Sequence, residues 1–466
     1  MRHVLSIPGE IYKMYLKRKI DQHLQEWASD PDHKPLLIRG ARQIGKTTAV
    51  RHLAESFSSF IEINFEKNGS IGKAFDGDLN IDRIIPELEA HVRQAIIPGK
   101  TLLFFDEIQA CPRAISALRY FYEEKQPLHV VATGSLLEFA FADISDFGVG
   151  RIRNIFMYPL SFAEFMSAMN ADVTLDHVRR ASFNSPISQP IHEMMLDFLK
   201  SFLIVGGMPA AVAAYVKTKS YIKAQQQQAD ITATLKSDFD KYRTKVSPDT
   251  IRAAFTSVVR QTGTKFNFSD AHSGISHQQA KACTSLLERA RIIHRISGTN
   301  ANGIPLGGDI NAKQNKFLLL DIGLYLCEAG LDVSNWILDP SAKFVNRGNL
   351  AEMFVALELL KGAQPLAEGR LFYWHREARN SNAEVDYVVQ FRNSVLPIEV
   401  KSGKRGSMTS LRMMMDAKGL SLAVRTSEEN FGAIGDNVRI IPLYLIGEYD
   451  RILRTAEDGG TAPTAP

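Results

Sequence analysis

Residues 35–53 read PLLIRGARQIGKTTAVRHL, and this stretch places a glycine-rich loop between a short apolar run and a helical pattern. The loop matches GxxxxGK[ST] in its required setting, with a strand before it and a helix after it. Glycine lets backbone N–H groups turn inward around an anion, and the start of the helix adds the positive end of its dipole. The stretch therefore predicts a phosphate-binding loop (P-loop) made by Gly40, Ala41, Arg42, Gln43, Ile44, Gly45, Lys46, Thr47 and Thr48.

A P-loop needs an acidic partner at the end of a neighbouring strand, and residues 101–107, TLLFFDE, supply it. We expect Lys46 to reach the β- and γ-phosphates of ATP, and Thr47 and Asp106 to hold Mg²⁺. Glu107 would orient or deprotonate the attacking water. An acidic pair that ends a strand is often only a cap or a solvated turn. Its position after a P-loop favours the catalytic interpretation, and ATP hydrolysis over phosphorylation of a small molecule.

Two further groups are candidates for contact with the γ-phosphate. Residues 129–135, HVVATGS, end in Thr133 and Ser135, where a hydroxyl could contact the phosphate or simply form a turn. Arg151 and Arg153 follow a glycine-rich stretch. We take Arg151 as a candidate arginine finger, acting in its own subunit or from a neighbour in a homo-oligomer. The alternative is that both arginines are ordinary surface residues.

The composition is that of a folded protein: 45% of its 466 residues are hydrophobic and 23% are charged. The 55 Lys and Arg residues against 51 Asp and Glu give a net charge of +4, too small to indicate nucleic acid by itself. The three cysteines lie far apart without CxxC spacing, which argues against disulfides or structural zinc and fits the cytoplasm.

The chain shows no segment that predicts membrane insertion. Its beginning has no apolar core followed by a cleavage site, so we expect no signal peptide. The most apolar stretch, residues 202–216 (FLIVGGMPAAVAAYV), is shorter than the roughly 20 residues of a membrane span, and GGMP interrupts it. A buried helix–turn–helix is the expected structure there.

The pattern along the chain predicts an α/β protein of several domains. Apolar runs at residues 36–39, 60–64, 101–105, 129–132 and 154–157 alternate with helical patterns, which predicts a parallel sheet within a P-loop domain at 34–165. A helical lead-in is expected at 1–33, a helical lid at 166–245, and a region of helices and a short strand at 246–335. A helix followed by strands is expected at 336–450, and a disordered tail at 451–466.

A second candidate site lies in the C-terminal region. Asp386 sits in an apolar strand, and the next strand, VLPIEVK at 395–401, carries Glu399 and Lys401 two residues apart on one face. Carboxylates on adjacent strands could chelate Mg²⁺ while the lysine activates a water. This D…ExK spacing resembles the core of the PD-(D/E)xK nucleases, in which an acid on the preceding helix completes the metal site. Glu352 is the matching position. Such a fold can cut DNA or persist as a binding module.

Residues 276–296 form a weaker candidate for contact with double-stranded DNA. Ser276-His-Gln-Gln279 is a capping box that should open a helix, and an apolar strand follows at 292–296. This order is compatible with a winged helix. The positive charge nearby comes from Lys281, Arg289, Arg291 and Arg295. A small helical subdomain with ordinary surface cations is an equally good interpretation.

Several of these segments resemble AAA-type ATPases found widely in bacteria and archaea. The segments are GARQIGKTT, LLFFDEIQ, VVATGS, GRIRNIFMYPLSFAEF, FLIVGGMPAAV, KFLLLDIGLYLCEAG and NRGNLAEMFVALEL, and they span roughly residues 35–405. The resemblance implies an AAA-type P-loop domain, a helical lid, a winged-helix-like module and a C-terminal domain that is restriction-endonuclease-like. It does not imply a biological role.

We therefore expect a Mg²⁺-dependent ATPase that acts as a switch or motor on DNA, with a nuclease-like domain in the same chain. The alternative is an ATPase whose C-terminal half is a non-catalytic, protein-binding or regulatory module. A P-loop kinase for a small metabolite is a third interpretation, disfavoured by Asp106-Glu107 and by the large C-terminal half.

Overall fold

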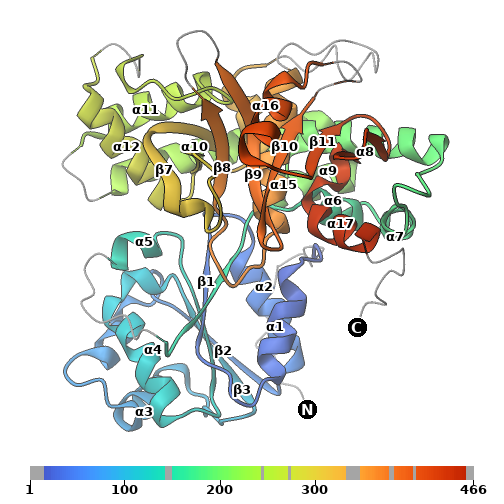
Figure 1. Ribbon diagram of the computed structural model, residues 1–466. Coiled ribbons are helices and arrows are strands. Elements are labelled where there is room, and N and C mark those ends of the chain that lie inside the picture. Colours follow the sequence, from blue (N-terminus) through green and yellow to red (C-terminus); the bar gives the residue numbers. More distant parts are fainter. Residues whose placement is uncertain are drawn as a thin grey trace.

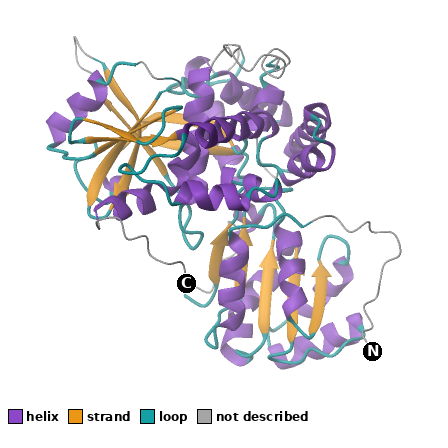
Figure 2. Cartoon of the chain, turned by 90° about the vertical axis from the view of Figure 1, so that its right-hand side faces the viewer, coloured by secondary structure: helices purple, strands orange, loops and turns teal. Residues whose placement is uncertain are grey.

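A computed structural model describes residues 15–141, 150–242, 246–270, 274–331, 347–376, 382–401, 403 and 406–457. The chain forms two parts, an α/β part around strands β1–β5 and a second part of helices around another sheet (Figure 1). Figure 2 shows both parts after a turn of 90°. The glycine-rich residues just before Gly150, residues 1–14 of the helical lead-in and the last nine residues lie outside the described residues.

The first sheet has five parallel strands in the order β2-β3-β4-β1-β5. Each strand begins and ends within one residue of the apolar run that predicted it. Parallel strands are buried on both faces, and every residue of β3 and β4 is buried. The predicted parallel α/β sheet is confirmed. The strands are β1 (Leu36–Arg39), β2 (Ser59–Asn64), β3 (Thr101–Asp106), β4 (His129–Thr133) and β5 (Arg153–Phe156).

Helices cover both faces of this sheet because successive strand residues point to opposite sides. Leu36 and Ile38 of β1 face one cluster of buried side chains and Leu37 faces the other. The first cluster includes helices α1 (Ile20–Ser29) and α2 (Lys46–Leu53). The second includes α3 (Ile81–Val92), α4 (Pro112–Glu124) and the short α5 (Leu137–Ala140).

The next region is helical, as expected. Its helices are α6 (Phe162–Ala168), α7 (Asp172–Arg179), α8 (Gln189–Val205), α9 (Pro209–Thr218), α10 (Tyr221–Ser237) and α11 (Pro248–Arg260). Gly206 and Gly207 form the turn between α8 and α9. A Cβ on Gly207 would lie 2.2 Å from the carbonyl oxygen of Leu160, so only glycine fits. Among the described residues, no helix is long and apolar enough to cross a membrane.

The second sheet has eight strands in the order β12-β13-β11-β10-β9-β8-β6-β7. Strands β6 and β7 form an antiparallel hairpin, and β6 pairs in parallel with β8. The expected boundary at residue 336 therefore runs through a single sheet. The strands are β6 (Ile293–Thr299), β7 (Ile310–Leu319), β8 (Leu371–Arg376), β9 (Ala383–Phe391), β10 (Ser394–Val400), β11 (Ala423–Ser427), β12 (Gly432–Ile434) and β13 (Val438–Pro442).

Helices α12 (His277–Arg289), α13 (Ile322–Glu328), α15 (Arg347–Gly362), α16 (Thr409–Lys418) and α17 (Tyr449–Glu457) complete the second part. The capping box expected at Ser276 and Gln279 is present at the start of α12. The expected disordered tail at 451–466 is wrong over its first residues, because α17 extends to Glu457. Ile452 and Leu453 on this helix are buried in the core, which stabilises it.

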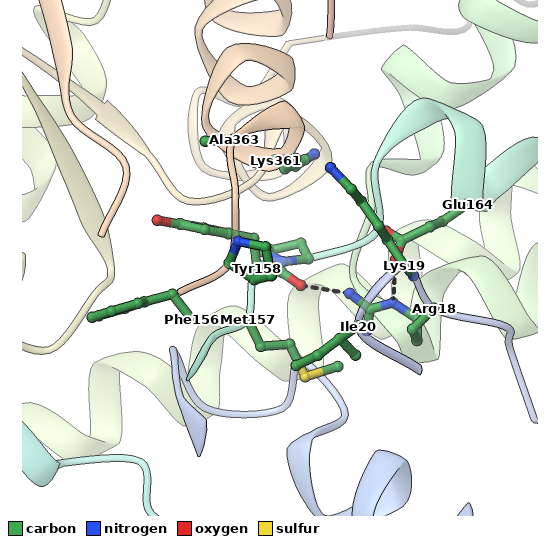
Figure 3. A pocket seen from close by; sticks show the side chains of 11 residues that line it. Arg18, Lys19, Ile20, Phe156, Met157, Tyr158, Glu164, Lys361 and Ala363 are labelled. Carbon is green, nitrogen blue, oxygen red and sulfur yellow. Dashed lines mark hydrogen bonds and ion pairs between the residues drawn. The ribbon is translucent and has the colours of Figure 1, made fainter. Parts of the chain in front are cut away.

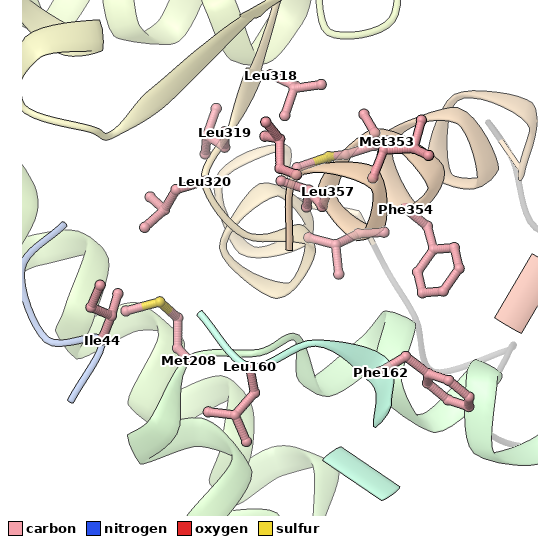
Figure 4. Close-up of a cluster of buried hydrophobic side chains, with 14 of the residues drawn as sticks. Ile44, Leu160, Phe162, Met208, Leu318, Leu319, Leu320, Met353, Phe354 and Leu357 are labelled. Atoms are coloured by element: carbon pink, nitrogen blue, oxygen red, sulfur yellow. The ribbon is translucent and has the colours of Figure 1, made fainter. Parts of the chain in front are cut away.

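One continuous cluster of buried side chains joins the two parts (Figure 4). Ile44 of the P-loop, Leu160 after β5 and Met208 at the start of α9 lie on one side of it. Leu320 after β7 and Leu357 of α15 lie on the other. The P-loop is therefore packed directly against the second part of the molecule.

Candidate functional site

The P-loop follows β1 and adopts backbone angles that favour glycine. Gly40 has φ of 154° and Gly45 has φ of 97°. A Cβ on Gly40 would lie 2.3 Å from the carbonyl oxygen of Met157, so the turn excludes any other residue. Ile44 is fully buried in the core, while Gln43 and Thr48 are exposed. The loop backbone is thus anchored by one apolar side chain.

Lys46 is the first residue of α2, and its ammonium group lies inside the loop. Its Nζ donates to the carbonyl oxygens of Gly40 at 3.0 Å and Ala41 at 2.7 Å. Burial lowers the pKa of Lys46 to about 8, although Glu107 and Asp106 nearby act in the opposite direction. A buried cation with only carbonyl partners is suited to bind a phosphate, which would supply the missing negative charge.

Asp106 lies at the carboxyl end of β3 and is held by three side chains. Thr47 Oγ1 donates to its Oδ1 at 3.1 Å, Thr133 Oγ1 donates to Oδ1 at 2.5 Å, and Asn64 Nδ2 donates to Oδ2 at 3.1 Å. These groups come together because β4 lies between β1 and β3, and the carboxyl ends of parallel strands share one edge. Thr47 and Asp106, both predicted as metal ligands, are therefore adjacent. Asn64 was not foreseen from the sequence.

Glu107 follows in a left-handed conformation, with φ of 49°, which turns its side chain away from the strand direction. Its Oε2 accepts from the Ser135 hydroxyl at 3.0 Å, the Ser135 N–H at 3.3 Å and Gln109 Nε2 at 2.6 Å. Ser135 therefore holds the carboxylate of Glu107, a role that differs from the predicted contact with a phosphate. A non-glycine residue with positive φ is a common feature of functional sites.

Two arginines tie the loop region to the rest of the chain. Arg42 Nη1 lies 2.6 Å from both carboxylate oxygens of Asp238, which is buried in the short helical turn after α10. Arg291, just after α12, donates to Glu138 at 2.7 Å and to Glu368 at 2.9 Å. Glu138 also pairs with Arg39, the residue before the P-loop. Sequence reasoning missed these links because the partners are far apart in the chain. Each pair is separated by 99 residues or more, except Arg291 and Glu368.

The structure does not bring Arg151 to the P-loop in this conformation. Arg151 Nε lies 3.0 Å from Oε1 of Glu123 on α4, and the side chain is half-exposed. Arg153 pairs with Leu36 at the amino end of the parallel strands, which is the edge opposite the P-loop, and its Nη1 lies 3.4 Å from Asp30. Both arginines have carboxylate partners away from the nucleotide edge.

The C-terminal acidic residues lie near one another on α15, β9 and β10. Lys401 Nζ donates to Glu399 at 2.6 Å, and Asp386 Oδ2 accepts from the Val400 N–H at 2.8 Å. The pKa of Glu352 is raised to about 8 and that of Glu399 to about 7, in both cases mainly by burial and next by the charge of Asp386. Burial also raises the pKa of Asp386. The three raised pKa values therefore come mainly from burial, with a smaller contribution from neighbouring carboxylates.

Lys316 is a further member of this acidic site that the sequence did not reveal. It lies on β7, is almost fully buried, and its Nζ lies 2.5 Å from Oε1 of Glu384 on β9. Its charge lowers the pKa of Glu352 and Asp386 against the effect of burial. The Lys316 side chain spans the two strands, β6 and β8, that lie between β7 and β9 in the sheet.

The fit of a metal ion to the acidic site is incomplete. Within the described part of the chain, no group of three or more His, Cys, Asp or Glu side chains has the spacing of a metal site. Glu352, Asp386 and Glu399 are thus close enough to interact electrostatically but do not converge as predicted. One observation favours a ligand: Oε2 of Glu399 is buried and has no hydrogen-bond partner.

The cations near α12 are largely occupied by protein partners. Arg289 donates to the carbonyl oxygen of Glu138 at 2.8 Å, and Arg295 donates to Glu288 at 2.5 Å. Arg291 is paired as described above, and Lys281 is exposed. The predicted positive surface for DNA is therefore weaker than the sequence indicated, because Arg289 and Arg291 are bonded to Glu138 and Glu368 elsewhere in the molecule and Arg295 is paired with Glu288 of α12.

Three family models match the chain. Residues 32–166 match a family described as an AAA domain. Residues 196–335 and 347–446 match two families described as domains of unknown function, DUF8612 and DUF4143. No curated protein matches the chain.

Solved structures with a similar chain course include the Orc1 protein of Aeropyrum pernix in complex with DNA, with 10% identity, 70% of this chain and 95% of that chain covered, and a TM-score of 0.29. PCH-2 of C. elegans is 14% identical, and the match covers 43% of this chain and 62% of PCH-2, with a TM-score of 0.25. The STAND protein PH0952 of Pyrococcus horikoshii, which has a tetratricopeptide repeat sensor, is 12% identical. The match covers 77% of this chain and 47% of PH0952, with a TM-score of 0.26. These scores are too low to carry an argument about function. The family match and the parallel sheet with its P-loop identify residues 32–166 as an AAA-type P-loop ATPase domain.

Proposed function

We propose that the protein is a Mg²⁺-dependent ATPase that works as a switch or motor. The observation that carries this proposal is the convergence of Thr47, Thr133 and Asn64 on Asp106, beside the buried Lys46. A hydroxyl and a carboxylate are the hard oxygen ligands that Mg²⁺ prefers, so Thr47 and Asp106 fit this ion. When bound, Mg²⁺ would neutralise charge on the phosphates.

The side chains of the site would bind the phosphates and activate the attacking water. Lys46 would leave the carbonyl oxygens of Gly40 and Ala41 and pair with the phosphates of ATP, while the N–H groups of the loop donate to the same oxygens. Glu107 would hold the attacking water and accept its proton. Ser135 and Gln109 both donate to Oε2 of Glu107, which leaves Oε1 as the oxygen for this task.

We further propose that α15 carries the effect of ATP turnover to the C-terminal half. Lys361 on α15 donates to the carbonyl oxygen of Leu160 at 2.9 Å, and Glu358 accepts from the N–H of Phe162 at 3.1 Å. Leu160 and Phe162 follow β5, which pairs with β1 of the P-loop. Both charged side chains are buried, so the contact is shielded from solvent.

For the C-terminal half, we propose a nuclease-like acidic site that acts on DNA. Lys401 beside Glu399, and the unpartnered oxygen of Glu399, support it. This function requires Glu352, Asp386 and Glu399 to move together around Mg²⁺, which would supply Lewis-acid activation of a phosphodiester. The second candidate function is a non-catalytic module that binds protein or regulates the ATPase. The absence of a converged three-ligand site among the described residues favours this second function.

The experiment follows phosphate release and DNA strand integrity together, with ATP, Mg²⁺ or Mn²⁺, and single- or double-stranded DNA. We expect ATP hydrolysis that rises with duplex DNA and falls with salt, because phosphate contacts are salt-dependent. Turnover that ignores both DNA and salt would contradict a role on DNA. Cleavage lost in Lys401→Ala would support the nuclease, and no cleavage with any metal would support the regulatory module.

A further inference from the structure

Arg18, in the segment before α1, lies outside the residues that match the AAA domain and contacts the P-loop. Figure 3 shows its other contacts, with Tyr158 and Glu164. Its Nη1 donates to the carbonyl oxygen of Ile44 at 2.8 Å, and its Nη2 donates to that of Tyr158 at 2.6 Å. Its Nε donates to Oε1 of Glu164 at 3.0 Å. The Arg18 side chain is 6% exposed, so these bonds are largely shielded from water. One buried arginine thus joins the lead-in, the P-loop and α6.

The bond to Ile44 fixes one peptide unit of the P-loop. In a trans peptide the C=O of one residue and the N–H of the next point in opposite directions. Because the carbonyl of Ile44 points to Arg18, the N–H of Gly45 points away from Arg18. Gly45 has φ of 97°, and Nη1 of Arg18 lies 3.6 Å from the position of a Cβ on Gly45. Arg18 therefore supports the Ile44–Gly45 peptide from the side of the Ile44 carbonyl and lies in ordinary contact distance of the Cβ position of Gly45.

The partner carboxylate is itself held in place. Glu164 accepts from the N–H of Ser161 at 2.7 Å and from the N–H of Lys19 at 2.6 Å. It is the third residue of α6 and closes a capping box with Ser161. Burial raises the pKa of Glu164, but Arg18 and these N–H groups outweigh burial and leave the pKa below its usual value. The carboxylate therefore stays charged and orients the guanidinium.

We propose that Arg18 is a positioning residue of the nucleotide site, which turns the Ile44–Gly45 peptide so that the N–H of Gly45 donates to a phosphate oxygen of the bound nucleotide. The inference rests on the nucleotide binding proposed above. Arginine suits this task because its planar fork serves three acceptors in fixed directions, whereas lysine has a single ammonium group. Without Arg18 the peptide is free to rotate, and the N–H of Gly45 loses its fixed direction.

The test compares Arg18→Met with wild type and with Lys17→Met, an exposed neighbouring cation as matched control. Binding of Mg-ATP is measured by calorimetry and the thermal unfolding midpoint by circular dichroism. We expect Arg18→Met to raise the Kd about 10- to 100-fold, the range for loss of one charge-assisted hydrogen bond, and Arg18→Lys to recover part of it. Lys17→Met should leave the Kd unchanged.

Two further readings separate a positioning role from a structural one. On addition of Mg-ATP, the Gly45 amide signal in ¹⁵N-glycine-labelled protein should shift strongly in wild type and little in Arg18→Met. If Arg18→Met does not fold, Glu164→Gln replaces it, since glutamine keeps the capping box and should raise the Kd by a smaller factor. A folded Arg18→Met or Glu164→Gln with the wild-type Kd would overturn the proposal. Wild-type protein that binds no ATP would instead overturn the proposed function.

Discussion

Raising the pH from 7 to 9 should weaken ATP binding by removing the charge of Lys46. Burial lowers the pKa of this lysine from the usual 10.5 to about 8. The nucleotide-free protein therefore holds the proton on about nine-tenths of Lys46 at pH 7 and on about one-tenth at pH 9. Bound phosphates favour the charged form, so the complex keeps its proton through this range.

The magnitude follows from linkage between the proton and ATP. Above pH 8 each ATP that binds must take up a proton at Lys46, and the Kd rises towards tenfold for each pH unit. Between pH 7 and pH 9 we expect an increase of about tenfold, or about 1.4 kcal/mol of binding free energy. The sign is fixed by the direction of the pKa change, because a lowered lysine pKa places the neutral form in the accessible range.

Calorimetry at pH 7, 8 and 9, in buffers with different ionisation enthalpies, measures both the Kd and the number of protons taken up. We expect an uptake of about 0.1 proton for each ATP at pH 7 and about 0.9 at pH 9. Lys46→Arg serves as a control, because arginine stays charged at pH 9. A Kd that is constant from pH 7 to 9, with no proton uptake at pH 9, would refute the reasoning about Lys46.

Three other predictions test separate parts of the molecule. Glu107→Gln should keep ATP binding and lower the turnover number at least about 100-fold, and equal loss of binding would contradict its proposed role. Gly40→Ala should abolish nucleotide binding, since the new Cβ would lie 2.3 Å from the carbonyl oxygen of Met157; a wild-type Kd by calorimetry would show that the loop can relax. Asp321→Ala should lower the free energy of unfolding by roughly 2–5 kcal/mol, because this fully buried carboxylate accepts N–H groups of Gly207, Gly323 and Leu324. Urea unfolding measures this loss, and Asp321→Asn, which keeps one acceptor, should lose less.

The P-loop sheet could be predicted because its signals are local. Strands β1, β3 and β4 are short, mostly apolar and buried runs, and the polar groups of the site lie in the loop after β1 and at the end of β3. The position of Thr133 beside Asp106 needed the strand order, with β4 between β1 and β3, which a linear pattern does not contain. The sequence therefore indicated Thr133 as a residue near the site, but it suggested a contact with the γ-phosphate or a turn, whereas the hydroxyl donates to Asp106.

The C-terminal half shows what local patterns miss. Strand β7 begins with INAKQNK, which is too polar to look like a strand, yet Lys316 in it is buried. Its partner Glu384 is 68 residues away in the sequence and lies on β9, with β6 and β8 between the two strands. Arg18 and Glu164, 146 residues apart, are a similar case. Such pairs depend on tertiary packing and leave no periodic signal in the chain.

Helix α15 connects the two candidate sites by its own geometry. Glu358 and Lys361 hold the backbone of Leu160 and Phe162, next to β5, whereas Glu352 of the acidic site lies six residues before Glu358. Six residues span about 9 Å of a helix. Because a helix moves as one body, a displacement of residues 160–162 would pass to Glu352 with little loss. A buried Glu–Lys pair seldom adds stability over apolar residues of the same size. Its place at this junction therefore favours a role in fixing how α15 sits on the P-loop domain.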